Sequence, residues 1–211
     1  MSNEEALIET LVRDGASIRL KDHPYALSLK WLGSATIYLA LSLMIAGLRP
    51  DLMLKLGSPL FIAEIALLVS IIATTCLSAA LLGYPDMYQR RPVTYAPALM
   101  FALFMWVILQ AWRTDFPPSP LPVHNVECLG FIILVTLLPA AWIFYSMRGL
   151  ASTHPYFAGG TALLAAFSLG ALSLRLSEQT DSVMHVMQWH YLPMIGAAVA
   201  GLLLGKTILK W

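Results

Sequence analysis

Charge is scarce in this sequence: 12% of its 211 residues are Asp, Glu, Lys or Arg, and the formal net charge is +1. The sequence contains no basic cluster, no aromatic stacking platform and no glycine-rich loop of the kind that cradles phosphates. Proteins that bind nucleic acid usually show such features, so direct contact with DNA or RNA is not expected. Residue patterns typical of serine, cysteine or metal hydrolases are missing as well, and we predict neither an enzyme nor a cofactor.

The start of the chain also lacks the features of a removable signal peptide. Such a peptide has a basic beginning and an apolar core within roughly its first 15 to 30 residues. Here the beginning is acidic and alternates apolar with charged positions. The N-terminal segment is therefore expected to remain on the mature protein.

Apolar residues dominate what is present, at 58% of the chain, and they gather in six runs long enough to cross a membrane. The predicted spans are Leu32–Leu48, Leu60–Gly83, Ala96–Trp112, Cys128–Met147, Ala158–Arg175 and His190–Leu209. This pattern predicts an all-α membrane protein with six transmembrane helices and a short N-terminal amphipathic helix. Residues 1–30 are predicted to form a cytoplasmic segment and residues 31–211 the transmembrane domain.

The distribution of Lys and Arg indicates how the spans are oriented. Six spans place both termini on one side, together with nine basic residues: Arg13, Arg19, Lys21, Lys30, Arg90, Arg91, Arg148, Lys206 and Lys210. The opposite side has four: Arg49, Lys55, Arg113 and Arg175. Since cytoplasmic loops carry the excess of Lys and Arg, both termini are predicted to be cytoplasmic.

Residues 1–30 form the stretch that is long and polar enough to act in water. Ser2 and Glu5 have the spacing of a capping box, and apolar residues then recur at helical spacing, which predicts a helix over about Asn3–Asp14. Its polar face is acidic, so anionic lipid would repel it and a basic protein surface suits it better. A plain lead-in to the first span is the alternative. The residues predicted to bind a protein partner are Leu7, Ile8, Leu11, Val12 and Arg13.

Glu64 is the one acidic residue within a predicted span, about one helical turn from its outer end. Such residues are functional candidates by default, because a charge in lipid is costly. It could reach the interface, pair with an arginine on the outer side or be protonated. No second carboxylate accompanies it to form a proton relay. A small multi-span transporter or channel that uses Glu64 is therefore the alternative function.

The outer side gathers residues that could bind a soft or borderline metal. Their spacing matches no established ligand motif, so the sequence alone predicts possible sensing and no metal site. Met184 and Met187 lie close to them in the sequence. The residues predicted as possible sensors are Cys128, His124, His185 and His190.

The second cysteine, Cys76, lies well inside its span, roughly 24 Å from the outer end at 1.5 Å per residue. Cys128 begins its span at the outer side. No disulfide is expected between two cysteines at such different depths.

Small residues recur along the last two predicted spans, which favours close contacts between helices. Packing within one chain is favoured over a dimer, although the sequence leaves both open. The positions are Gly159, Gly160, Ala166, Gly170, Ala197, Gly201 and Gly205.

Three stretches together resemble one known family over nearly the whole chain. The first is GLRPDL at residues 47–52 with SPLF at residues 58–61, and the second is RGLASTHP at residues 148–155, which runs into a glycine-alanine helix. The third is Trp189, the glycine-rich last span and the closing residues 209–211. In this order they resemble the NrsF-like family of six-span bacterial anti-sigma factors, which regulate an extracytoplasmic-function (ECF) sigma factor negatively.

The resemblance implies a multi-pass protein of the bacterial inner membrane that regulates transcription in a stress response. The helix around residues 6–13 resembles the family's leader, which is implied to hold the ECF sigma factor at the cytoplasmic face until an envelope or periplasmic signal releases it. Family members tend to carry a second outer cysteine before the last span. Residues 175–182 read RLSEQTDS here, so sensing by a pair of thiols is not expected.

Overall fold

Every element in the described part of the chain is a helix. The computed structural model describes residues 3–16, 22–85, 91–114 and 126–210. Its elements are α1 (Asn3–Ala16), α2 (Pro24–Ala46), α3 (Leu52–Lys55), α4 (Pro59–Leu82), α5 (Arg91–Thr114), α6 (Val126–Met147), α7 (Pro155–Ser177), α8 (Val183–Val186), the π-helix η2 (Met187–Tyr191) and α9 (Leu192–Ile208). The predicted all-α fold class is confirmed.

Within these described ranges, six helices are long and apolar enough to cross a membrane: α2, α4, α5, α6, α7 and the continuous segment formed by α8, η2 and α9. They correspond to the six predicted spans. The first begins earlier than predicted, because α2 starts at Pro24 rather than near Leu32. His23 caps this helix by accepting a hydrogen bond from the Tyr25 backbone N–H at 3.4 Å. Proline is favoured at the first helical position, where no N–H is needed.

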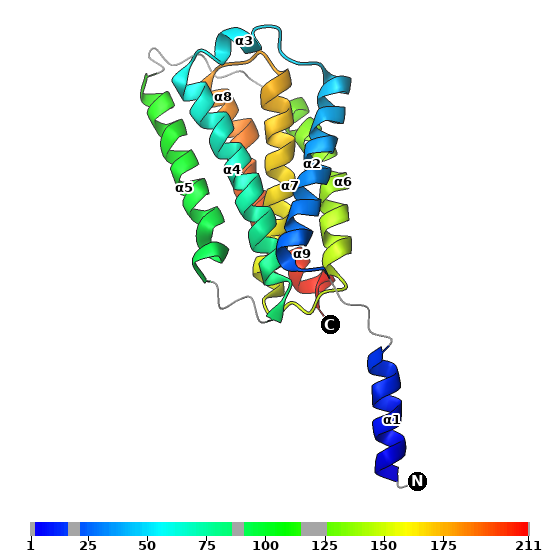
Figure 1. Cartoon of the computed structure of the whole chain (residues 1–211). Helices are drawn as coiled ribbons and strands as arrows, with labels where there is room; N and C mark the ends of the chain where they lie inside the picture. Colours follow the sequence, from blue (N-terminus) through cyan, green and yellow to red (C-terminus); the bar gives the residue numbers. More distant parts are fainter. Residues whose placement is uncertain (1–2, 17–21, 86–90, 115–125, 211) are drawn as a thin grey trace.

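Helix α7 lies at the centre of the bundle, where it contacts α9, α4, α6 and α2, while α5 packs on α4 at the edge (Figure 1). Its central position explains its composition. Ala158, Ala162 and Ala171 on α7 are completely buried. Small side chains let neighbouring helices approach from several sides, and in lipid this close packing is what holds helices together.

The crossing of α7 and α9 is the closest of these approaches. A Cβ atom added to Gly159 would lie 2.7 Å from the backbone nitrogen of Gly205. One added to Gly170 would lie 2.8 Å from the carbonyl oxygen of Ile132 on α6. The predicted close contacts at these glycines are therefore confirmed, and they join helices of one chain.

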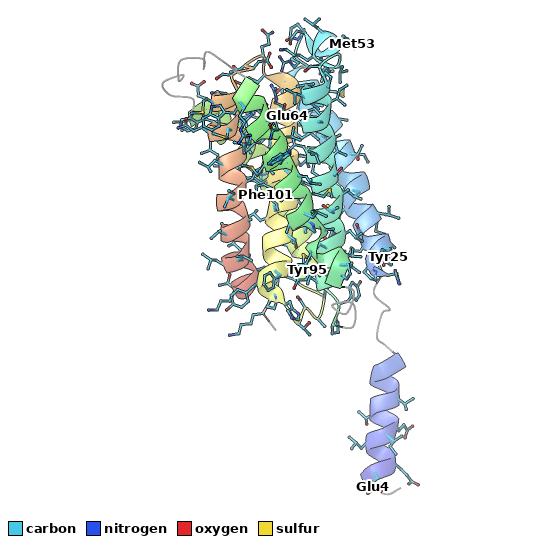
Figure 2. All side chains as sticks on the ribbon, turned by 90° about the vertical axis from the view of Figure 1, so that its left-hand side faces the viewer. Glu4, Tyr25, Met53, Glu64, Tyr95 and Phe101 are labelled. Carbon is cyan, nitrogen blue, oxygen red and sulfur yellow. The ribbon has the colours of Figure 1, made fainter. Side chains whose placement is uncertain are left out.

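The two ends of the bundle differ, and we name them by what they carry. Helix α1 and the last turn of α9 lie at the same end, the terminal end, with α1 drawn apart from the bundle (Figure 1). The short helix α3 covers the opposite, distal end, where Met53 is found (Figure 2). The segment between α7 and α8 also lies at the distal end. The side chains discussed below come from the helix ends that meet there.

Candidate functional site

Helix α1 carries the residues predicted to bind a partner. Leu7, Ile8 and Val12 are 59%, 60% and 67% exposed. Leu11 and Arg13 belong to the same helix, but their side chains lie outside the described residues. An exposed apolar stripe on a short helix has the form used by helices that bind in a groove of another protein.

Four side chains meet at the distal end, each from a different element. Cys128 lies in the first turn of α6, Glu178 directly follows α7, His185 belongs to α8 and His190 to η2. One ligand atom from each residue can be chosen so that all four lie within 4.8 Å of one another. Three of these residues were predicted as possible sensors from the sequence, and the structure brings them together. The fourth predicted sensor, His124, lies outside the described residues.

Glu178, which is not among the residues predicted from the sequence, is at the centre of this Cys–Glu–His–His cluster. Its two carboxylate oxygens are each 3.6 Å from the Cys128 Sγ. Oε1 lies 3.4 Å from the Nε2 of His185, and Oε2 lies 3.1 Å from the Nε2 of His190. The Cys128 Sγ is 3.7 Å from the Nε2 of His185. Each side chain of the cluster thus contacts at least one other.

The π-helical turn explains why both histidines face the same side. Residues five apart on an α-helix point about 140° away from each other. A π-helix has i→i+5 hydrogen bonds, so every fifth residue returns to nearly the same side. The rings of His185 and His190 are accordingly 5.3 Å apart between centroids. Pro193 follows two residues after η2, and it lacks the N–H that an α-helix would direct at the Trp189 carbonyl.

The cluster is secluded, and part of its hydrogen-bonding capacity is unused within the described residues. His185 and His190 are both completely buried. The Nδ1 of each ring and the Nε2 of His190 make no hydrogen bond there, although the latter is close to Glu178. Burial acts to raise the pKa of Glu178, but contacts with His190, Thr180 and His185 outweigh it and lower that pKa to about 2. Glu178 is thus a carboxylate facing two buried imidazoles.

A second cluster adjoins the first and contains Glu64, which Figure 2 shows near the distal end. Arg175 donates from Nε to Oε1 of Glu64 at 2.7 Å and from Nη2 to Oε2 at 3.2 Å. The hydroxyl of Tyr191 also donates to Oε1 of Glu64. Of the three states considered for Glu64, pairing with an arginine is the one observed, and this arginine lies in the last turn of α7. Both of its oxygens are engaged.

Arg175 and Arg49 share a second carboxylate, that of Asp181. Arg175 Nη1 donates to Oδ1 of Asp181 at 3.2 Å, and Arg49 Nη2 donates to Oδ2 at 3.0 Å. Arg49 also holds Asp51 through two hydrogen bonds of 2.8 and 2.9 Å. The Phe61 ring lies 5.6 Å from Cζ of Arg49 and 4.9 Å from Cζ of Arg175, within the range of cation–π attraction. Residues 47–52 and 58–61, which carry the family resemblance, thus brace the distal end.

Tyr191 connects the two clusters. It directly follows His190, its hydroxyl reaches Glu64, and its ring meets that of Phe104 edge-on at a centroid distance of 4.6 Å. Tyr191 itself is completely buried. A displacement of η2 would therefore disturb the contacts that Tyr191 makes with Glu64 on α4 and with Phe104 on α5.

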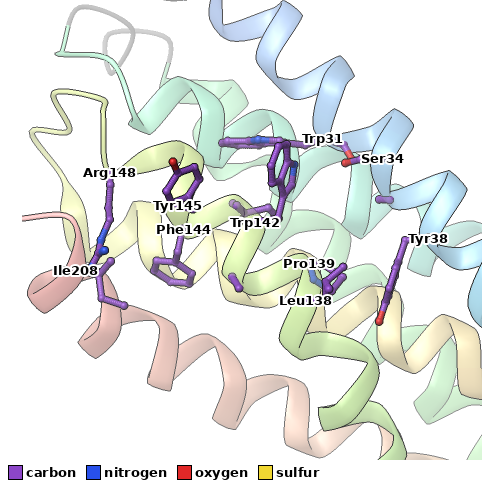
Figure 3. Close-up of a pocket in the computed structure, with 13 residues that line it drawn as sticks. Trp31, Ser34, Tyr38, Leu138, Pro139, Trp142, Phe144, Tyr145, Arg148 and Ile208 are labelled. Carbon is purple, nitrogen blue, oxygen red and sulfur yellow. The ribbon is translucent and has the colours of Figure 1, made fainter.

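An apolar groove of about 770 Å³ lies between α2 and α6 (Figure 3). Its lining includes Trp31, Tyr38, Pro139 and Trp142, and Arg148 is the one charged side chain among the described residues that line it. Catalytic and metal sites need several converging polar or titratable groups. This groove does not supply them, whereas the two clusters at the distal end do.

Comparison with known proteins agrees with this architecture. The family model described as NrsF, negative regulator of sigma F, matches residues 11–211. A curated relative from Azospira oryzae, named probable anti-sigma-F factor NrsF, is 29% identical over 199 residues, which cover 89% of this chain and 88% of the relative. No solved structure matches. The family match includes all six membrane-span candidates and both distal clusters. The chain therefore belongs to the NrsF family of negative regulators of sigma F.

Proposed function

We propose that this protein is an inner-membrane anti-sigma factor that sequesters an ECF sigma factor through its N-terminal segment. A signal at the opposite face of the membrane changes the packing of the spans and releases the sigma factor. The proposal requires no chemical reaction, only two arrangements of the helices that differ in their affinity for the sigma factor. The observation that carries it is the exposed apolar stripe of α1 in a member of this family.

The chemistry of α1 suits a sigma factor as partner. Glu4 and Glu5 make its first turn acidic, and sigma factors bind DNA, so they present basic surfaces. Opposite charge speeds encounter, while burial of apolar anchors supplies most of the affinity. The family match begins at residue 11, so Leu7 and Ile8 lie outside it. Their part in binding is supported by their exposure and by their place in the stretch that resembles the family's leader.

The proposed orientation places the terminal end in the cytoplasm, where a sigma factor is found. It is supported by the nine-to-four distribution of Lys and Arg between the two sides. The distal end, with its two polar clusters, would then face the periplasm. A periplasmic signal would act on the distal end and release the sigma factor at the other.

The continuous segment of α8, η2 and α9 supports this direction of signalling. It begins at Val183 at the distal end, carries His185 and His190 there, and finishes at Ile208 at the terminal end. Coupling free energies between two sites are typically about 1–3 kcal/mol, which changes binding by roughly 5–150-fold. A distal signal of that size is enough to alter how much sigma factor is free.

The alternative, a transporter or channel that uses Glu64, is not favoured by the geometry. A transport carboxylate exchanges its proton or ion with a water-filled path. Glu64 instead binds Arg175 and Tyr191, and its side chain is only 9% exposed. These contacts give it a structural role between α4, α7 and η2.

Co-purification of the candidate ECF sigma factor with the full-length membrane protein tests the proposal. A variant lacking residues 2–14 should insert into the membrane normally and lose the sigma factor. The matched control replaces Met53 and Leu54 on α3 by Ala, because these are exposed apolar residues at the distal end. Equal sigma-factor recovery with the truncated and unaltered proteins would contradict the proposal.

A further inference from the structure

We propose that Cys128, Glu178, His185 and His190 bind a single divalent ion of the zinc type. The four side chains supply one thiolate, one carboxylate and two imidazoles, which is a set of ligands that Zn²⁺ commonly accepts. This inference concerns metal binding alone. It does not depend on sequestration of a sigma factor by α1.

The measured distances in the cluster are close to those of a tetrahedral site, and all four ligand atoms lie within 4.8 Å of one another. Zn–S bonds of about 2.3 Å and Zn–N or Zn–O bonds of about 2.0–2.2 Å place tetrahedral ligands about 3.3–3.7 Å apart. The Cys128 Sγ lies 3.6 Å from both Glu178 oxygens and 3.7 Å from the His185 Nε2. Glu178 oxygens lie 3.4 Å from His185 Nε2 and 3.1 Å from His190 Nε2. An ion can therefore enter with small adjustments of side chains.

The burial of the histidines provides an independent argument. Both rings are completely buried, and burying a polar group without a partner is costly. Within the described residues, the Nε2 of His190 makes no hydrogen bond even though Glu178 lies 3.1 Å away. A ring nitrogen that faces a carboxylate without an aligned N–H is suited to donate its lone pair to a metal between them.

Charge balance favours a divalent ion in this buried cluster. Metal ligands bind in their deprotonated forms, so Cys128 and Glu178 contribute two negative charges and the imidazoles none. With a divalent ion the site is neutral, which suits a secluded position beside a membrane-spanning bundle. Ca²⁺ and Mg²⁺ prefer sites made entirely of oxygen ligands, whereas thiolate and imidazole select zinc-like metals.

A bound ion would join elements that are otherwise far apart in the chain. Cys128 is on α6, and Glu178, His185 and His190 are spread over the end of α7, α8 and η2. The ion would bridge α6 to the segment that leads into the last span. Because ligands that bind only the folded state stabilise it, metal should raise the unfolding temperature of the whole protein.

The test uses the full-length protein in detergent, freed of metal with a chelator and titrated with Co²⁺ as a coloured substitute for Zn²⁺. We expect one Co²⁺ per chain, the intense visible bands of tetrahedral Co²⁺ and a thiolate-to-metal charge-transfer band. Zn²⁺ should abolish all of these bands. A weak octahedral spectrum, or no saturable binding, would overturn the inference.

Three variants assign the ligands, with a fourth as control. Cys128→Ser should remove the charge-transfer band. Glu178→Gln and His190→Gln should each weaken Co²⁺ binding by more than the roughly 10–100-fold that is typical when a residue that only hydrogen-bonds to a metal ligand is lost. His154→Gln, at the terminal end of α7, should bind Co²⁺ as the unaltered protein does. Unchanged affinity in all three ligand variants would place the ion elsewhere.

A second measurement needs no variant and holds even if these proteins fold poorly. Zn²⁺ should slow alkylation of Cys128 by a maleimide in the unaltered protein, as followed by mass spectrometry of its peptide. The peptide with Cys76, buried in α4, provides the internal comparison. Equal alkylation of Cys128 with and without Zn²⁺ would contradict coordination by this thiol.

Discussion

Arg175 on α7 binds both carboxylate oxygens of Glu64 on α4, at 2.7 and 3.2 Å, and the two side chains are only 8% and 9% exposed. Residues 111 positions apart in the sequence are thereby joined inside the bundle. A buried ion pair contributes little net stability, but removing Glu64 leaves the buried charge of Arg175 with Asp181 as its remaining acidic partner. The distal end therefore depends on both residues being present.

The first prediction concerns this pair. Glu64→Leu should lower the free energy of unfolding by about 3 kcal/mol or more, since Arg175 keeps its charge in a buried site. The double replacement Glu64→Leu with Arg175→Met should be more stable than the single one, because the buried guanidinium is then absent while Asp181 keeps Arg49 and Lys55 as partners. Unfolding in mixed detergent micelles, followed by tryptophan fluorescence, measures both.

The matched control for this prediction is the exposed pair formed by Lys30 and Asp22, whose side chains are 62% and 50% exposed. Lys30→Met should change stability by less than about 1 kcal/mol, because water screens such pairs. If Glu64→Leu were no more damaging than Lys30→Met, the buried pair would not have the structural role assigned to it.

The second prediction concerns the crossing of α7 and α9. Gly159→Ala should destabilise the protein by about 1–3 kcal/mol, since the added methyl group meets the backbone of Gly205 and the helices must separate. Gly196→Ala on α9 should be neutral or slightly stabilising, because an added Cβ there meets no atom within 4 Å. Equal unfolding curves for these two variants would show that the crossing is not as close as described.

The third prediction concerns the pH dependence of stability. Burial acts to raise the pKa of Asp181, but hydrogen bonds from Arg49 and Lys55 outweigh it and lower that pKa to about 2. The pKa of an unfolded Asp is about 3.9, so the stabilisation is complete above that pH and is lost as the pH falls toward 2. Asp181→Asn should therefore be most destabilising above about pH 4. A stability difference that stays constant between pH 2 and pH 6 would contradict this.

The fourth prediction concerns orientation in the membrane. A reporter that is active only in the cytoplasm should be active when fused after Lys210. A reporter that is active only in the periplasm should be active within residues 117–122, a proline-rich stretch on the predicted outer side. The reverse pattern would overturn both the orientation and the proposed access of α1 to a sigma factor.

The six spans could be predicted because a membrane imposes length and hydropathy on each helix separately. The glycine contacts of α7 and α9 were also evident, since small residues recur along each helix. The start of α2 at Pro24 could not be read from the apolar run, because the charged Lys30 lies within the first two turns of this helix. His23 and Pro24, which cap and begin the helix, were the signal that could have located it.

The Cys–Glu–His–His cluster was only partly predictable. His185 and His190 are five residues apart, a spacing that places ligands on different sides of an α-helix. The π-helical turn that aligns them is a property of the folded chain. Glu178 lies 50 residues from Cys128, and nothing in its own neighbourhood marks it as a ligand. Such a cluster depends on tertiary packing, which a single sequence does not reveal.

The most direct test of sigma-factor sequestration is the affinity of the purified full-length protein, with Leu7 and Leu11 both replaced by Ala, for its ECF sigma factor. Truncating an interface anchor costs about 2 kcal/mol or more, and two anchors are truncated here, so the dissociation constant should rise at least about a hundredfold. Sigma-dependent transcription should become constitutive, while membrane insertion stays normal. A double variant that inserts normally, binds the sigma factor with unaltered affinity and still silences transcription would contradict the proposed role of α1.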